Sequence, residues 1–204
     1  MPQADRETIV AGFGRMAQLI RASADHWHAN DYFGRQDYQN HVVAHTVGML
    51  ALGYAIGDRE LVQYALDHPD NHRDYVELIA GSILMPGDIP HVCEPAGRTV
   101  HVGEIDDRYR HFTTPDHSKG LHYSHLTLSL LTVGSEILYC NGLDFYRYVA
   151  QGGETLELPF TFYSDFYRTR DSAIGDGFYA GESWRIGLAS DSPELFEIAA
   201  LRYP

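Results

Sequence analysis

The sequence predicts a mainly α domain of helical hairpins with one long loop. Apolar residues recur at helical spacing in several segments. Short turn signals separate these segments, such as Gly57-Asp58, Pro69 and Asn141-Gly142. A stretch broken by proline and glycine, from Pro86 to Ser118, is too long for an ordinary turn and is typical of a functional loop. The 204 residues fit a single domain, 1–204, with a core of its own.

The first half of the chain is expected to form four helices. The first runs from Arg6 to about Ala24, and His26-Trp27-His28 then leads into a polar, aromatic connection through Tyr32 and Phe33. The next three are expected at Tyr38–Ile56, Arg59–Leu66 and Asn71–Ile83. Gly57 suits the end of the second helix, and Asp58 suits the cap of the third.

The second half is expected to centre on a helix from Gly120 to Tyr139. Its apolar residues form two stripes, nearly all round the helix, which predicts a buried helix. Short helices are expected at Asp144–Val149 and Thr155–Tyr167, and a last one at Pro193–Leu201 with Ser192 as its cap. Within the long loop, Val100 and Val102 favour a short strand.

Composition excludes several classes of protein. The formal net charge of −13 argues against nucleic acid as the partner, because phosphate binding needs a basic face. The chain contains no run of about 18 apolar residues without polar breaks, so no membrane span is predicted. No signal peptide is seen, so the chain as it stands is expected in the cytoplasm, or exported if its start is artificial. Cys93 and Cys140 form no Cys-x-x-Cys motif, and we expect one disulfide or two buried thiols.

Positive and imidazole side chains gather in one part of this acidic chain. Five of the twelve histidines lie between His101 and His125, together with Arg108, Arg110 and Lys119. Such a cluster can hold an anionic substrate that the rest of the surface would repel. We therefore expect His101, Arg110, Lys119 and His122 to contact the substrate.

Asn40 and His41 are placed at the start of a helix, where free backbone N–H groups and the positive end of the dipole favour a carboxylate. Asn40 is equally suited to be only the helix cap. His41 and His45 are four residues apart and share a helix face, which allows a metal pair. A zinc-protease helix would have glutamate at position 42, where this chain has Val42, so we favour packing or substrate contact over a metal.

Tyr123 begins the apolar helix, beside His122 and close to Lys119. Nearby cations stabilise a phenolate, so a tyrosine in this position can exchange a proton. Taken alone, it could equally be a half-buried core aromatic, as one of fourteen tyrosines.

The order of these motifs resembles the alginate lyase-like polysaccharide lyases. The matching pieces run from about Tyr38 to Tyr167: Asn40-His41, Gly53/Gly57-Asp58, Gly103-Glu104, Asp107-Arg108-Tyr109-Arg110, Gly120-Leu-His-Tyr123 and Asn141-Gly142-Leu-Asp-Phe-Tyr146. The resemblance implies an incomplete (α/α) toroid and β-elimination of a uronic-acid polymer of the alginate or glucuronan type. It implies no cofactor and no metal.

The resemblance also implies roles for four residues. Asn40 and an arginine would neutralise the uronate carboxylate, and His41 and Tyr123 would handle protons. Arg108 and Arg110 are both candidates for the arginine, with Arg108 preferred. Trp27 and His45 are expected to help bind the sugar chain.

One feature departs from that family. Only 39 residues precede Asn40, whereas the family usually carries more helices there. We expect that a partner subunit supplies the missing wall, that the groove is open, or that the chain is a fragment. A non-catalytic polyuronate-binding module and a metal-dependent hydrolase using His41 and His45 are the alternatives.

Overall fold

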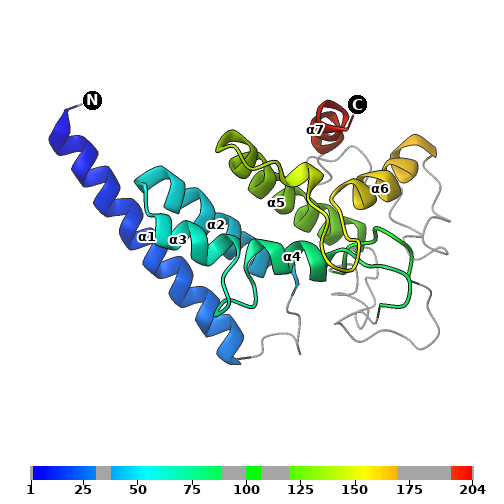
Figure 1. The fold of residues 1–204 in the computed structure, drawn as a ribbon, viewed down its shortest axis with the longest axis horizontal. Helices are drawn as coiled ribbons and strands as arrows, with labels where there is room; N and C mark the ends of the chain where they lie inside the picture. The colour runs from blue at the N-terminus through cyan, green and yellow to red at the C-terminus, as the bar shows by residue number, and fades with distance from the viewer. Residues whose placement is uncertain (1, 31–37, 89–99, 107–119, 170–193, 204) are drawn as a thin grey trace.

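A computed structural model describes residues 2–30, 38–88, 100–106, 120–169 and 194–203. The prediction of a mainly α fold is confirmed: this part of the chain contains helices and one isolated antiparallel bridge between Ile83 and Ile105. Figure 1 shows the first helices packed side by side in alternating directions. No helix in the described ranges is long and apolar enough to cross a membrane.

Helix α1 (Gln3–Asn30) is longer at both ends than the sequence indicated. His26-Trp27-His28, expected after the end of this helix, lies in its last turns. Helix α1 packs against α2 (Asn40–Ile56), and the two run in opposite directions (Figure 1). The helix end expected near Ala24 was wrong, because a helix can continue wherever a neighbouring helix accepts its apolar face. The connection through Tyr32 and Phe33 lies outside the described residues.

Helices α2 and α3 (Arg59–Leu66) are joined by the expected turn. Gly57 ends α2 with φ of 75°, and the backbone N–H groups there bond to the carbonyl oxygens of Gly53 and Tyr54. The Asp58 side chain caps α3 by accepting a hydrogen bond from the N–H of Leu61 at 3.0 Å. Both local predictions are thus confirmed.

Helix α4 (Tyr75–Ser82) begins four residues later than predicted. Its cap is Asp74, whose carboxylate accepts hydrogen bonds from the N–H groups of Glu77 at 2.9 Å and His68 at 2.8 Å. Asn71 lies in the turn before the cap, where its amide donates to the Tyr64 carbonyl at 2.7 Å. A carboxylate that bonds two backbone donors fixes the helix start more firmly than the earlier polar residue does.

Helix α5 (Gly120–Cys140) matches its predicted range to one residue. Only one of its two apolar stripes is fully buried. Leu121, Leu128, Leu131 and Leu138 are 0 to 1% exposed, whereas Leu126 is 37% and Val133 is 50% exposed. The helix is therefore buried on one face and not all round.

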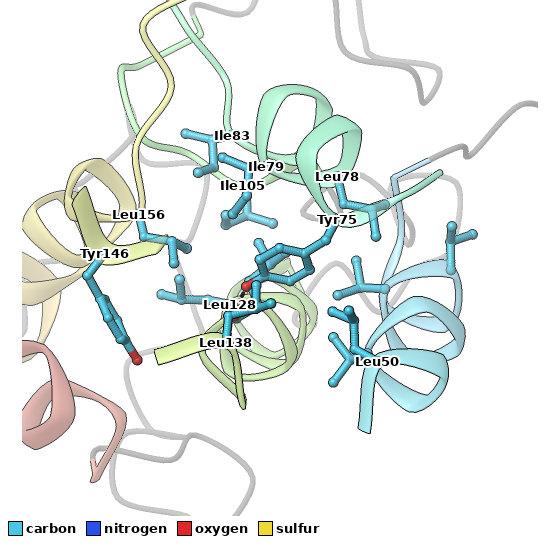
Figure 2. Close-up of a cluster of buried hydrophobic side chains, with 14 of the residues drawn as sticks. Leu50, Tyr75, Leu78, Ile79, Ile83, Ile105, Leu128, Leu138, Tyr146 and Leu156 are labelled. Atoms are coloured by element: carbon cyan, nitrogen blue, oxygen red, sulfur yellow. Dashed lines mark hydrogen bonds between the residues drawn. The ribbon is translucent and has the colours of Figure 1, made fainter. Parts of the chain in front are cut away.

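The core is centred on Tyr75, the first residue of α4. Figure 2 shows its ring between α4 and α5, and Leu50 of α2 lies to the right of α5. The Tyr75 hydroxyl donates to the Leu131 carbonyl and lies 2.9 Å from Ser135 Oγ. Burial raises the pKa of this phenol, so the hydroxyl stays protonated and keeps α4 fixed to α5.

The C-terminal part comprises a 3₁₀ turn, η2 (Phe145–Arg147), and helices α6 (Glu157–Thr169) and α7 (Glu194–Arg202). Arg202 of α7 reaches Glu136 of α5 through two hydrogen bonds of 2.8 Å. The Tyr146 hydroxyl donates to the same carboxylate at 2.8 Å. These bonds tie the last helix to α5. Ser192 and Pro193, expected at the start of this helix, lie outside the described residues.

Two smaller predictions were wrong. Val100 and Val102 form no strand; the extended pairing instead joins Ile83 to Ile105. Cys140 was expected to be buried or in a disulfide, but it is an exposed free thiol because α5 ends at the surface. Cys93 lies outside the described residues. Closure of the helices into an (α/α) toroid stays a prediction.

Candidate functional site

The start of α2 presents an amide and an imidazole in different surroundings. Gln39, and not Asn40, is the N-cap: its side chain accepts a hydrogen bond from the N–H of His41. Asn40 is the first helical residue and is 4% exposed, while His41 is exposed. The interpretation of Asn40 as a mere cap is therefore wrong, and its buried amide lies at the positive end of the helix.

His41 and His45 lie on the side of α2 that faces α1. The Trp27 indole stacks on the His41 ring, with centroids 4.7 Å apart and planes 19° apart. It meets the His45 ring edge-on at 6.3 Å. His45 Nε2 lies 3.1 Å from Ser23 Oγ. Burial, assisted by His41 and Arg73, lowers the pKa of His45, so this imidazole is neutral at ordinary pH.

The start of α5 carries the predicted tyrosine. Tyr123 and His122 are half-buried, and their rings are 5.1 Å apart. His125, one turn further along, is fully buried, and burial lowers its pKa to about 3. The site thus has partly accessible rings at the helix start and a neutral imidazole beneath them.

Residues 101–106 form a fixed turn near these helix starts. Leu84 N–H donates to the Glu104 carbonyl at 2.8 Å, and Gly103 N–H donates to the Leu84 carbonyl at 2.9 Å. The buried Glu104 carboxylate accepts a hydrogen bond from the His101 N–H at 2.9 Å. The His101 ring stacks on Phe162 of α6 with centroids 6.2 Å apart.

Helices α2 and α5 pack against each other and run in the same direction, so both of their starts lie at one end of the molecule (Figure 1). Asn40 and His41 are therefore at the same end as His122 and Tyr123.

Contacts between these elements support the same arrangement. Next to the start of α2, Tyr38 packs against Gly81 of α4. Two residues beyond Gly81, Ile83 pairs with Ile105, whose N–H donates to the Tyr163 hydroxyl at 3.0 Å. The Tyr163 ring in turn lies 5.1 Å from that of His125, in α5.

Several buried polar side chains lie at this end, and none of them was among the predicted site residues. They are Gln39, Glu104, Asp106, Ser124, His125 and Thr127, all 0 to 2% exposed. His125 could have been found from its spacing, because it falls between Leu121 and Leu128 on the core stripe. Burying a polar group is costly unless it is hydrogen-bonded, so these side chains are ones whose partners the fold must supply.

Three of the predicted site residues, Arg108, Arg110 and Lys119, lie outside the described residues. Within the described ranges, no three His, Cys, Asp or Glu side chains are grouped so as to hold a metal ion. A groove of about 570 Å³ lies between α1 and α3, lined by residues such as Arg21 and Tyr64. None of the predicted site residues lines that groove, so we place the candidate site at the helix starts and not there.

The chain was compared with known proteins. Neither the curated proteins nor the solved structures gave a match. A family model described as alginate lyase matches residues 1–173, which covers most of the chain and all the elements from α1 to α6. The chain therefore belongs to the alginate lyase family, a family of polysaccharide lyases.

Proposed function

We propose that the protein cleaves a uronic-acid-containing polysaccharide, of the alginate or glucuronan type, by β-elimination. The observation that carries the proposal is that two helix starts lie at the same end of the molecule, one with Asn40 and His41 and the other with Tyr123. Membership of the alginate lyase family supports the same class of reaction.

The first requirement of the reaction is a neutralised carboxylate. The C5 proton of a uronate becomes acidic when the charge that develops on its carboxylate is stabilised. The Asn40 amide, nearly buried at the positive end of α2, supplies hydrogen-bond donors and the helix dipole. In the proposal, the guanidinium of Arg108 supplies the positive charge that faces the carboxylate.

The second requirement is proton transfer. A base removes the C5 proton, the C5–H electrons form the C4–C5 double bond, and the C4–O4 bond breaks. Tyr123 or His41 takes the C5 proton, depending on the face of the sugar that bears it. Tyr123 gives a proton to the leaving O4, so the products are a new chain end and a 4,5-unsaturated uronate.

The remaining predicted residues would hold the charged chain. His101 and His122 belong to the turn and the helix start that border the site, and Arg110 and Lys119 come from the segment between them. A local positive group is needed because the whole chain carries a formal net charge of −13.

The proposal is tested by mixing the protein with mannuronate, guluronate and glucuronate polymers, with and without EDTA. The ultraviolet absorbance of unsaturated uronate ends is followed over time. We expect a rise on at least one polymer that EDTA leaves unchanged. Binding without any rise would indicate the polyuronate-binding module, and cleavage that EDTA abolishes would indicate the metal-dependent hydrolase.

Two variants test the residues. Tyr123→Phe and His41→Ala are each expected to lower kcat by about 10²- to 10⁴-fold, the range for general acid–base groups. Matched controls are Tyr54→Phe in the last turn of α2 and His72→Ala on the surface, which should keep full activity. Full activity in both Tyr123→Phe and His41→Ala would rule out the mechanism.

A further inference from the structure

Trp27 contacts both imidazoles on the facing side of α2. Its indole lies nearly parallel to the His41 ring at 4.7 Å and edge-on to the His45 ring at 6.3 Å. One indole face is thus covered by an imidazole of this chain. The sequence suggested that Trp27 stacks on sugar, and this role would have to use the part of the indole that the imidazoles leave uncovered.

The two helices are held together at this level by specific contacts. Ser23 Oγ lies 3.1 Å from His45 Nε2, one turn from the stacked pair. A turn further on, Ile20 Cδ1 packs against Gly48, 3.1 Å from where a Cβ would lie. The indole of Trp27 is therefore carried by a helix whose place against α2 is fixed.

Arg73 holds α1 and α2 together through a second set of contacts. Its guanidinium donates to the Ala24 carbonyl of α1 at 3.2 Å, and its own carbonyl accepts from the Thr46 hydroxyl of α2 at 2.7 Å. The turn of α1 just before Trp27 is thus held to α2 both by Ser23 and through Arg73, so the Trp27 ring is carried by a fixed helix.

His41 needs such a support more than a buried residue would. It is exposed in the first turn of α2, where an imidazole can adopt several rotamers. Stacking on a fixed indole restricts the ring to one plane and directs its nitrogens along that plane. Holding a reacting group in the productive orientation accounts for a large part of enzymatic rate enhancement.

We propose that Trp27 is a positioning residue, which sets the orientation of the His41 imidazole and thereby the rate of elimination. This inference rests on the proposed function. It predicts a loss in kcat when the aromatic ring is removed, whereas a sugar-stacking residue would chiefly affect KM.

The test compares Trp27→Leu with Trp27→Phe on the polymer that the wild-type protein cleaves. We expect Trp27→Leu to lower kcat by about ten- to a hundredfold with KM nearly unchanged, because a small misplacement can cost that much. Trp27→Phe, which keeps a ring to stack on, should recover most of the rate. Leu19→Ala, at a 70% exposed position of the same helix, is the control and should behave as the wild type.

A second readout does not depend on activity. A stacked indole shifts the ring-proton NMR signals of His41 upfield, and His41→Gln identifies those signals by their loss. We expect the shift to disappear in Trp27→Leu and to persist in part in Trp27→Phe. Unfolding of Trp27→Leu would be seen by circular dichroism, in which case Trp27→Phe and the wild-type signal still decide whether the rings stack.

Several outcomes would overturn the inference. They are an unshifted His41 signal in the wild type, wild-type kcat in a folded Trp27→Leu, or a loss confined to KM. Failure of the proposed function would appear differently, as a wild-type protein that cleaves no polyuronate although its His41 signal is shifted. That result would also overturn the catalytic part of the inference and leave only the stacking.

Discussion

The replacement of Gly103 by alanine is the sharpest test of how the turn of residues 101–106 is built. Gly103 has φ of 85°, in the left-handed region that favours glycine. An added Cβ would lie 2.5 Å from the carbonyl oxygen and 2.6 Å from the carbonyl carbon of Leu158 in α6. Both atoms belong to the backbone, so they cannot rotate away as a flexible side chain would.

Two costs add in this variant. The left-handed conformation costs an L residue about 1–2 kcal/mol, and forcing an extra carbon into a packed contact costs about 1–3 kcal/mol. We therefore expect the free energy of unfolding to fall by about 2–5 kcal/mol. At about 2–4 °C per kcal/mol for a domain of this size, Tm should fall by about 4–20 °C.

Gly142→Ala provides the matched control. Gly142 has φ of 88°, and no atom lies within 4 Å of an added Cβ. This variant should bear only the conformational cost of about 1–2 kcal/mol. Urea unfolding followed by circular dichroism gives both values, with the m-value checking that the unfolded state is unchanged. Equal destabilisation of the two variants would refute the close approach of the turn to α6.

Three further predictions concern the helices that carry the site. Glu136→Gln should lower Tm at neutral pH. The Arg202 hydrogen bonds hold the pKa of Glu136 below its ordinary value of 4.5. The stability that ionised Glu136 contributes is therefore present above that pH and is lost as pH falls through the folded-state pKa. The wild-type and variant melting curves should therefore converge in acid, and a constant difference would contradict this. Tyr75→Phe should cost about 1 kcal/mol in urea unfolding, because it removes the hydroxyl bonded to Ser135 and the Leu131 carbonyl; no change would show that these bonds contribute nothing net. Asp58→Ala should lower the free energy of unfolding by about 1 kcal/mol, because α3 loses its cap. Asp58→Asn, which still offers a capping oxygen, should retain most of that stability.

Short-range signals in the sequence located most of the helices. The run from Gly120 fixed α5 to within one residue, and Gly57-Asp58 fixed the end of α2 and the start of α3. These signals work because capping and left-handed termination depend on atoms within four residues of each other. The motifs that suggested an alginate lyase are of the same kind, since each is a short run of residues.

What the sequence could not supply depends on contacts between distant residues. Nothing local showed that α1 continues through Trp27, because that turn is stabilised by the side chains of α2 that it meets. The two stripes of α5 looked alike, and only the packing of α2 and of Tyr75 from α4 on one side decided which is buried.

The candidate site likewise depends partly on local sequence and partly on tertiary packing. The sequence by itself identified its residue types, Asn40, His41 and Tyr123, and the helix starts that carry them. Only the tertiary structure brought the two starts to one end, buried Asn40, and stacked Trp27 on His41. The physical reason is that a residue's identity fixes its chemistry and its local backbone preference, whereas its burial and its partners are set by which helix faces pack together.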